Sequence, residues 1–293
     1  MGSQSNHIET AFDYNYAPPG TAALSTRTPF PQYDRIYGFN SGAAANYHAM
    51  LLSAEKRFGG GLSFKGSYTW AKALTMNGGR TAAGNIGQIQ NPLNFKDEKG
   101  VTVDNIKQRF VNSLVYELPW GKGKPLGSNM NAITDKILGG WTVSAITTFR
   151  SGFWLDPRVN NVNNCNSASN NFCRPDLVGN PYLDSNGVDS PMFDINAFNW
   201  PRKTTPFANP RYGTAGVNIL EGNGINTWDM AVLKNIAWAD RYRIQFRWEL
   251  FNAFNHASFG QPSATPDTPA TFGRVTGTAI GPREMQFGLK FYF

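Results

Sequence analysis

The chain has 293 residues, the length of about two average domains or of one large β architecture, and no apolar run approaches the ~20 residues that a transmembrane helix requires. Charged residues make up only 16% of the chain and aromatic residues as much as 14%, which argues against intrinsic disorder. The net charge of +7 is spread over alternate positions of strand-like segments, so that no basic run indicates a nucleic-acid partner.

Apolar and polar residues alternate with a period of two through most of the chain, which predicts β-strands. The first clear pair covers residues 46–58 and 62–73, joined by three glycines at 59–61 that suit a tight hairpin because glycine tolerates a positive φ. Later strands are expected at residues 109–118, 140–150, 226–236, 242–254 and 284–293. With residues 33–41 undecided, the count is seven or eight.

The segment 242–254 indicates which face is apolar. One face carries Tyr242, Ile244, Phe246, Trp248 and Leu250, and the other carries Arg243, Gln245, Arg247 and Glu249. If lipid surrounds the sheet, turning this strand over would cost ~2–4 kcal/mol for each arginine near the bilayer midplane. The polar face should therefore line a lumen, with basic residues at Lys65, Arg150, Arg243, Arg247 and Lys290.

The connections alternate in length. Residues 59–61 and 237–240 are short and 119–138 is intermediate, whereas 74–107, 153–225 and 255–283 are long and rich in Asn, Gly and Pro. Consecutive hairpins of a meander open at opposite ends, so all long loops gather at one end. This is the asymmetry of an outer-membrane barrel, with short periplasmic turns and long external loops, the longest being 153–225. A soluble β-sandwich also alternates, but a structureless loop of this length is uncommon in a compact domain.

Aromatic residues gather near the predicted strand ends. We expect one group near the short turns, formed by Trp120, Trp141, Trp228 and Trp238. The other group, near the long loops, contains Tyr68, Trp70, Phe149 and Trp154. Two such groups match the aromatic girdles at the two interfaces of a bilayer. In a soluble carbohydrate-binding β-domain, exposed aromatics would instead line a groove.

Four stretches resemble the C-terminal barrel of TonB-dependent outer-membrane receptors, most closely the Oar-like, carboxypeptidase-regulatory-like-domain type common in acidobacteria. They are residues 68–72 (YTWAK), 116–121 (YELPWG), 251–256 (FNAFNH) and 287–293 (FGLKFYF). The similarity spans essentially all of residues 1–293, with residues 2–3 at the tail of a strand already running in the family. It implies an all-β antiparallel meander in the cell outer membrane and energised uptake of a large solute.

In that family a signal peptide, a TonB box and a plug precede a barrel of about 22 strands. None of the three is recognisable here, so we expect a C-terminal segment of such a receptor: a truncated gene, a partial assembly or an internal start. Expected partners are outer-membrane lipid, the barrel-assembly machinery, an unknown solute and, through the missing N-terminal parts, the TonB system. Two alternatives are a self-contained small barrel acting as an adhesin or structural surface protein, and a soluble carbohydrate-binding β-domain.

The end of the chain also resembles the signal by which the assembly machinery selects barrels. Its aromatic and apolar residues are in phase up to the last one: Met285, Phe287, Leu289, Phe291 and Phe293. A plain amphipathic edge strand is the alternative.

Few residues indicate a chemical site. Cys165 and Cys173 lie in the longest loop and could form a disulfide, or remain as two thiols in a reducing compartment. Asp184, Asn186 and Asp189 could offer oxygens to Ca²⁺ but fit an ordinary Asx-rich turn better. The motifs of hydrolases, nucleotide-binding proteins and zinc proteases are missing, so we expect no catalytic residues, no metal site, no cofactor and no enzyme activity.

Overall fold

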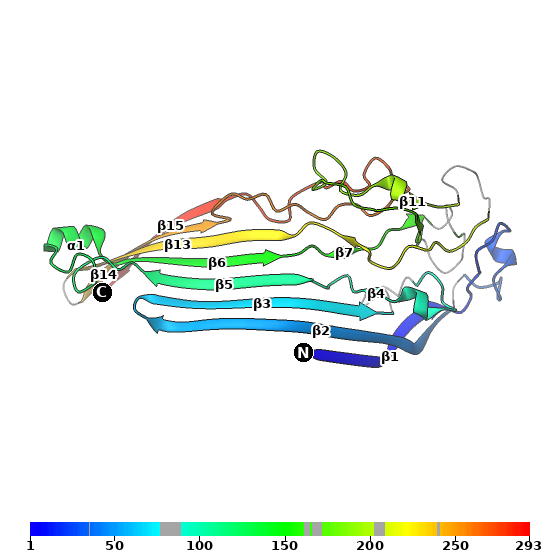
Figure 1. Cartoon of the computed structure of the whole chain (residues 1–293), viewed down its shortest axis with the longest axis horizontal. Coiled ribbons are helices and arrows are strands. Elements are labelled where there is room, and N and C mark those ends of the chain that lie inside the picture. The colour runs from blue at the N-terminus through cyan, green and yellow to red at the C-terminus, as the bar shows by residue number, and fades with distance from the viewer. Residues whose placement is uncertain (35, 77–88, 161–164, 166–171, 202–208, 239–240) are drawn as a thin grey trace.

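The computed structural model describes residues 1–34, 36–76, 89–160, 165, 172–201, 209–238 and 241–293. It contains one nine-stranded antiparallel sheet, in which eight strands follow one another in sequence order (Figure 1). These are β1 (Gly2–Asp13), β2 (Tyr37–Gly59), β3 (Leu62–Thr75), β5 (Gln108–Glu117), β6 (Trp141–Arg150), β13 (Ile225–Trp238), β14 (Tyr242–Phe251) and β15 (Glu284–Tyr292). The short β4 (Gly100–Val101) pairs with the end of β3. The expected all-β meander is confirmed.

All seven predicted strands are found; six differ by three residues or fewer at their ends, whereas β2 begins nine residues before the predicted residue 46. The segment 33–41, left undecided by its sequence, enters β2 from residue 37 onward. Residues 2–3, expected at the tail of a strand, instead begin β1, which continues to Asp13. The hairpin between β2 and β3 turns on Gly60 and Gly61, whose φ angles are +61° and +81°. A turn of two residues with positive φ matches the right-handed twist of its strands, which explains the glycines.

β14 ends at Phe251, three residues earlier than predicted. Asn252 follows with a φ of +48°, which turns the chain out of the sheet. Its side chain holds the turn, because Oδ1 accepts from the His256 backbone N–H and Nδ2 donates to the His256 carbonyl, both at 3.0 Å. The motif 251–256 therefore stops a strand instead of continuing it.

The two ends of the sheet differ as expected (Figure 1). The β2–β3 turn and the β5–β6 and β13–β14 connections lie at one end, and the connections after β1, β3, β6 and β14 lie at the other. The β5–β6 connection contains a seven-residue helix, α1 (Ala132–Leu138), that alternation did not predict. Asn131 caps it by accepting hydrogen bonds from the backbone N–H groups of Ile133 and Thr134.

The long connections fold against one another. Seven buried side chains form their core: Val159, Phe193, Ala197, Phe198, Trp200, Leu220 and Phe272. Around it lie the small strand pairs β7 (Trp154–Leu155) with β12 (Leu220–Glu221), β8 (Val159–Asn160) with β9 (Phe172–Cys173) and β10 (Asp176–Leu177) with β11 (Phe198–Asn199). The part of the chain that the structure describes also contains 3₁₀ turns at Leu24–Thr26, Phe95–Glu98 and Ile195–Ala197. The main buried core thus lies beyond the sheet, in what the sequence suggested to be structureless loops.

The register of the sheet aligns the apolar faces of its strands. Tyr68 lies opposite Phe110, which lies opposite Phe149, and Val143, Val232 and Trp248 form a similar row further along. Large side chains on this face remain open to the surroundings, for example Leu289 at 72% exposure. Among the described residues, no helix has the length and apolar character needed to cross a membrane.

Candidate functional site

The polar face of the sheet brings together the five basic residues predicted to share it. Strand register places Lys65, Arg150, Arg243, Arg247 and Lys290 on the face opposite to the aromatic rows. Several have neighbours that offset or spread their charge. Lys65 Nζ lies 3.9 Å from Glu55, Arg247 pairs with Glu249, and the Arg243 guanidinium lies 4.2 Å from the ring centre of Tyr292. The face is therefore polar and mixed in charge.

The apolar face carries the residues of the predicted assembly signal. Met285, Phe287, Leu289 and Phe291 lie opposite the apolar residues of β14, and the Phe287 ring stacks on Phe246 and Trp248 with centroids 6.1 and 6.0 Å apart. The ring of Phe293 continues the row, 6.0 Å from Phe291 and 90% exposed. These residues present a continuous aromatic surface at the last strand.

The aromatic residues occupy both ends of the sheet, with one correction. Tyr68 and Trp70 lie toward the long loops, and Trp120 and Trp141 lie at the short-turn end. Trp238 pairs there with Tyr242, although its side chain is outside the described residues.

Trp228 was predicted near the short turns but lies near the long loops. It is the fourth residue of β13, which enters the sheet from a long connection, and its ring centroid is 5.6 Å from that of Phe149.

A buried ion pair joins two of the long connections. Arg174 Nη1 lies 2.8 Å from Glu98 Oε2, and the two side chains are 5% and 1% exposed. Arg174 also donates to the carbonyls of Ala215 and Asp97 at 2.8 and 3.1 Å. The second oxygen of Glu98 accepts from the backbone N–H of Gln90 at 2.9 Å. Because both charges are paired and hydrogen-bonded, this cluster holds the β3–β5 and β6–β13 connections together.

A second ion pair lies beside the first. Asp176 accepts hydrogen bonds from the Arg211 guanidinium and from the Thr214 backbone N–H. The hydrogen bond from Arg211 is the main reason that the pKa of Asp176 lies below its usual range, and the same bond raises the pKa of Arg211. Both residues therefore stay charged at neutral pH, and the pair fixes residues 211–214 to β10.

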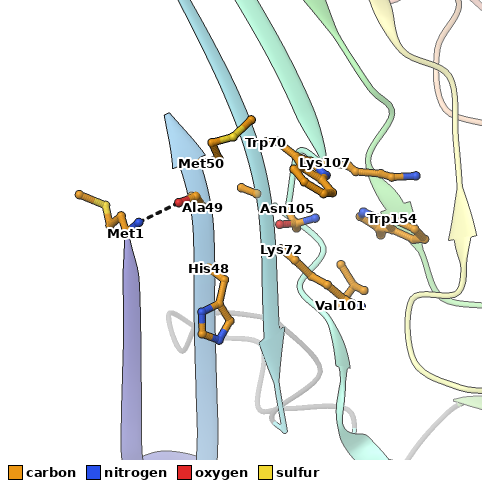
Figure 2. A pocket seen from close by; sticks show the side chains of 11 residues that line it. Met1, His48, Ala49, Met50, Trp70, Lys72, Val101, Asn105, Lys107 and Trp154 are labelled. Atoms are coloured by element: carbon orange, nitrogen blue, oxygen red, sulfur yellow. Dashed lines mark hydrogen bonds between the residues drawn. The ribbon is translucent and has the colours of Figure 1, made fainter. Parts of the chain in front are cut away.

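A cavity of about 590 Å³ lies where β2 and β3 meet the long connections (Figure 2). Met50, Trp70 and Trp154 give it apolar surface, and Lys72 and Lys107 bring positive charge. Lys107 Nζ lies 3.8 Å from Glu221, and the indole N–H of Trp154 is buried with no hydrogen-bond acceptor in the described part of the chain. The cavity can hold an amphiphilic group that accepts a hydrogen bond. No motif indicated it, because its residues come from five separate segments.

The remaining candidate residues have structural roles. A disulfide joins Cys165 and Cys173, whose Cα atoms lie 6.3 Å apart, and both residues are buried. In the turn that contains Asp184, Asn186 and Asp189, Asn186 Oδ1 accepts from the Val188 backbone N–H at 3.1 Å, as in the Asx turn that its sequence favoured. Within the described ranges, no group of three or more His, Cys, Asp or Glu side chains could hold a metal ion.

The comparison with known proteins agrees with this geometry. A family model described as "Outer membrane beta barrel domain" matches residues 1–286. The match therefore covers seven of the eight long strands completely and reaches into β15. No curated protein matches the chain.

Proposed function

This chain belongs to the outer membrane beta barrel domain family, whose place is the cell outer membrane, and from that premise we propose that it forms part of a TonB-dependent receptor barrel. In this proposal the apolar face contacts lipid and the polar face lines the lumen. The long connections face the exterior and contribute to capture of a large solute, which energised transport then carries inward. The plug and the TonB box belong to parts of the receptor outside residues 1–293.

The open edges of the sheet carry this proposal. β1 and β15 stand at opposite ends of the strand order, so the meander forms a wall with two edges. Inside a bilayer an unpaired edge is costly, because lipid cannot accept hydrogen bonds from backbone N–H groups. A wall of eight long strands with an apolar outer face is best completed by further strands of a larger barrel.

The ordered loops support a receptor role over a purely structural one. The Glu98–Arg174 cluster and the apolar core of the long connections fix their arrangement at the mouth of the barrel. The cavity beside Trp70 and Trp154 borders this region, but its β2 and β3 residues share the face of Tyr68 that the proposal assigns to lipid, so it is not counted as part of the lumen. Siderophore complexes, oligosaccharides, peptides and vitamin complexes are the classes to test.

Uptake by intact cells tests this proposal. Cells with and without the gene would be given labelled members of the four solute classes, with and without a protonophore. We expect the gene to raise accumulation of one class, and the protonophore to abolish that gain. Accumulation that is independent of the gene for every class, or unaffected by the protonophore, would contradict energised uptake and favour a surface adhesin or structural barrel.

We also propose that β15 acts as the assembly signal of the barrel. Deleting Phe293 removes the last member of its exposed aromatic row. The deletion should lower the amount of heat-modifiable barrel in outer membranes. Phe293→Tyr, which keeps an aromatic ring, should be close to wild type. An unchanged yield after deletion would leave β15 as a plain edge strand.

A further inference from the structure

The connection between β5 and β6 presents an apolar surface at the short-turn end of the sheet. Five large side chains there are exposed: Trp120 at 47%, Leu126 at 51%, Ile133 at 74%, Ile137 at 61% and Leu138 at 39%. Ile133 and Ile137 are four residues apart on α1, so they form one ridge of the helix. Such a cluster is unusual for a turn that contacts only water.

Two side chains of the lipid-facing surface attach this connection to the sheet. Trp141 and Lys234 are Cα partners and share the apolar face with Val143 and Val232. The Trp141 indole N–H donates to the Ile137 carbonyl at 3.0 Å, and Lys234 Nζ donates to the Gly139 carbonyl. The end of α1 is therefore held on the lipid side of the wall and not over the lumen.

The charges of the connection complement a phospholipid surface. Residues 118–140 contain three lysines and one aspartate. Lys122 and Lys136 are exposed, whereas the aspartate, Asp135, is half-buried and accepts from the Lys122 backbone N–H. A short amphipathic element with apolar residues on one side and lysines beside them is the pattern of a segment that lies in a bilayer interface.

We propose that residues 118–140 lie in the periplasmic leaflet of the outer membrane, as an interfacial anchor beside the barrel wall. Ile133 and Ile137 enter the boundary of the acyl chains, and Lys122 and Lys136 contact the phosphates of anionic phospholipids. The surface continues the lipid-facing side of the sheet through Trp141, which is why lipid and not a protein is the occupant. The proposal of this anchor depends on membership of the outer membrane barrel family and does not depend on which solute the barrel carries.

Nitroxide labels on the full chain in vesicles of phosphatidylethanolamine and phosphatidylglycerol test this anchor. In a Cys165→Ser, Cys173→Ser background, labels would be placed through Ile133→Cys and Ile137→Cys. Ser128→Cys, exposed in the same connection, is the control for water, and Leu52→Cys on the apolar face of β2 is the control for lipid. Collisions with oxygen report lipid, and collisions with a water-soluble nickel chelate report water.

The labels at 133 and 137 should be more accessible to oxygen than to nickel, as at position 52, whereas position 128 should favour nickel. If the labels at 133 and 137 are accessible to nickel while the label at 52 is accessible to oxygen, the anchor is wrong although the barrel is inserted in lipid. If the label at 128 is also accessible to oxygen, the connection does not have one side in lipid and the other in water. Replacing phosphatidylglycerol by phosphatidylcholine should reduce the depth of the labels at 133 and 137 in the bilayer. An unchanged depth would show that the lysines do not contact anionic phospholipids.

Discussion

Glu98 and Arg174 show at the residue scale how the long connections are held together. Both charges are almost completely buried. Glu98 also accepts from the Gln90 backbone N–H of its own connection, and Arg174 donates to the Ala215 carbonyl of its own connection and to the Asp97 carbonyl of the other. Removing one partner leaves the other charge buried and unpaired, which costs about 3–5 kcal/mol. Glu98→Gln should therefore raise hydrogen exchange in the β3–β5 and β6–β13 connections.

The exposed pair of Lys124 and Glu117 provides the matched control, since both side chains are 39% exposed. Glu117→Gln should cost no more than about 1 kcal/mol and leave exchange in the long connections unchanged. Equal effects of Glu98→Gln and Glu117→Gln would show that the buried pair does not hold the loops.

Asp176 makes the same region sensitive to acid. Its pKa is lowered in the folded chain, chiefly by the hydrogen bond from Arg211, so its contribution to stability is present above the ordinary aspartate pKa of about 4. That contribution is lost as the pH falls through the lowered value. Protease cleavage in the region of residues 211–214 should increase on acidification below about pH 4. Asp176→Asn should be cleaved readily already at neutral pH, with a smaller further change in acid; the same acid response in both proteins would exclude Asp176 as its source.

At the scale of a single element, neighbouring residues of β13 lie on opposite faces of the sheet. Val232 lies between Val143 and Trp248 on the apolar face, whereas Ala231 lies between Ser144 and Glu249 on the polar face. Val232→Arg should destabilise the membrane-inserted chain by about 2–4 kcal/mol, and Ala231→Arg by much less because Glu249 is opposite. Urea unfolding in lipid vesicles would measure both; a larger loss for Ala231→Arg would mean that the faces are reversed.

Strands could be predicted well because the alternation of apolar and polar residues along each strand reflects the different surroundings of the two faces of the sheet. Alternation in 242–254 gave the face of every residue in β14, but not its end, which depends on the side chain of Asn252. The position of Trp228 was wrong although the connection lengths already contain it: β13 follows the long connection 153–225, so its first residues lie at the long-loop end.

Other features could not be predicted from sequence patterns, because they are short or depend on contacts between distant segments. At seven residues α1 is too short to show helical periodicity. Glu98 and Arg174 are 76 residues apart, so no local spacing connects them. The cavity residues likewise come together only through the pairing of β2, β3 and the long connections.

At the scale of the whole molecule, the sheet is a wall with a lipid face, a polar face and two edges. The ordered connections pack together beyond one end of the sheet, and the β5–β6 connection lies at the other end (Figure 1), where the Trp141 indole N–H bonds to it. In the proposed arrangement the apolar side chains of the sheet face lipid, which accounts for a sheet that contributes little to the buried core. Our proposal of a larger receptor barrel requires that β1 and β15 pair with strands other than each other.

Cysteine cross-linking in outer membranes tests that requirement most directly. Cysteines scanned along β1 would be paired with cysteines along β15, and a short bis-maleimide would be added to intact membranes. Gln245→Cys with Lys290→Cys, Cα partners on β14 and β15, is the positive control and should cross-link efficiently. We predict no cross-link within one chain between β1 and β15 at any position. Efficient β1–β15 cross-linking would contradict the account and show a small barrel closed by its own eight long strands.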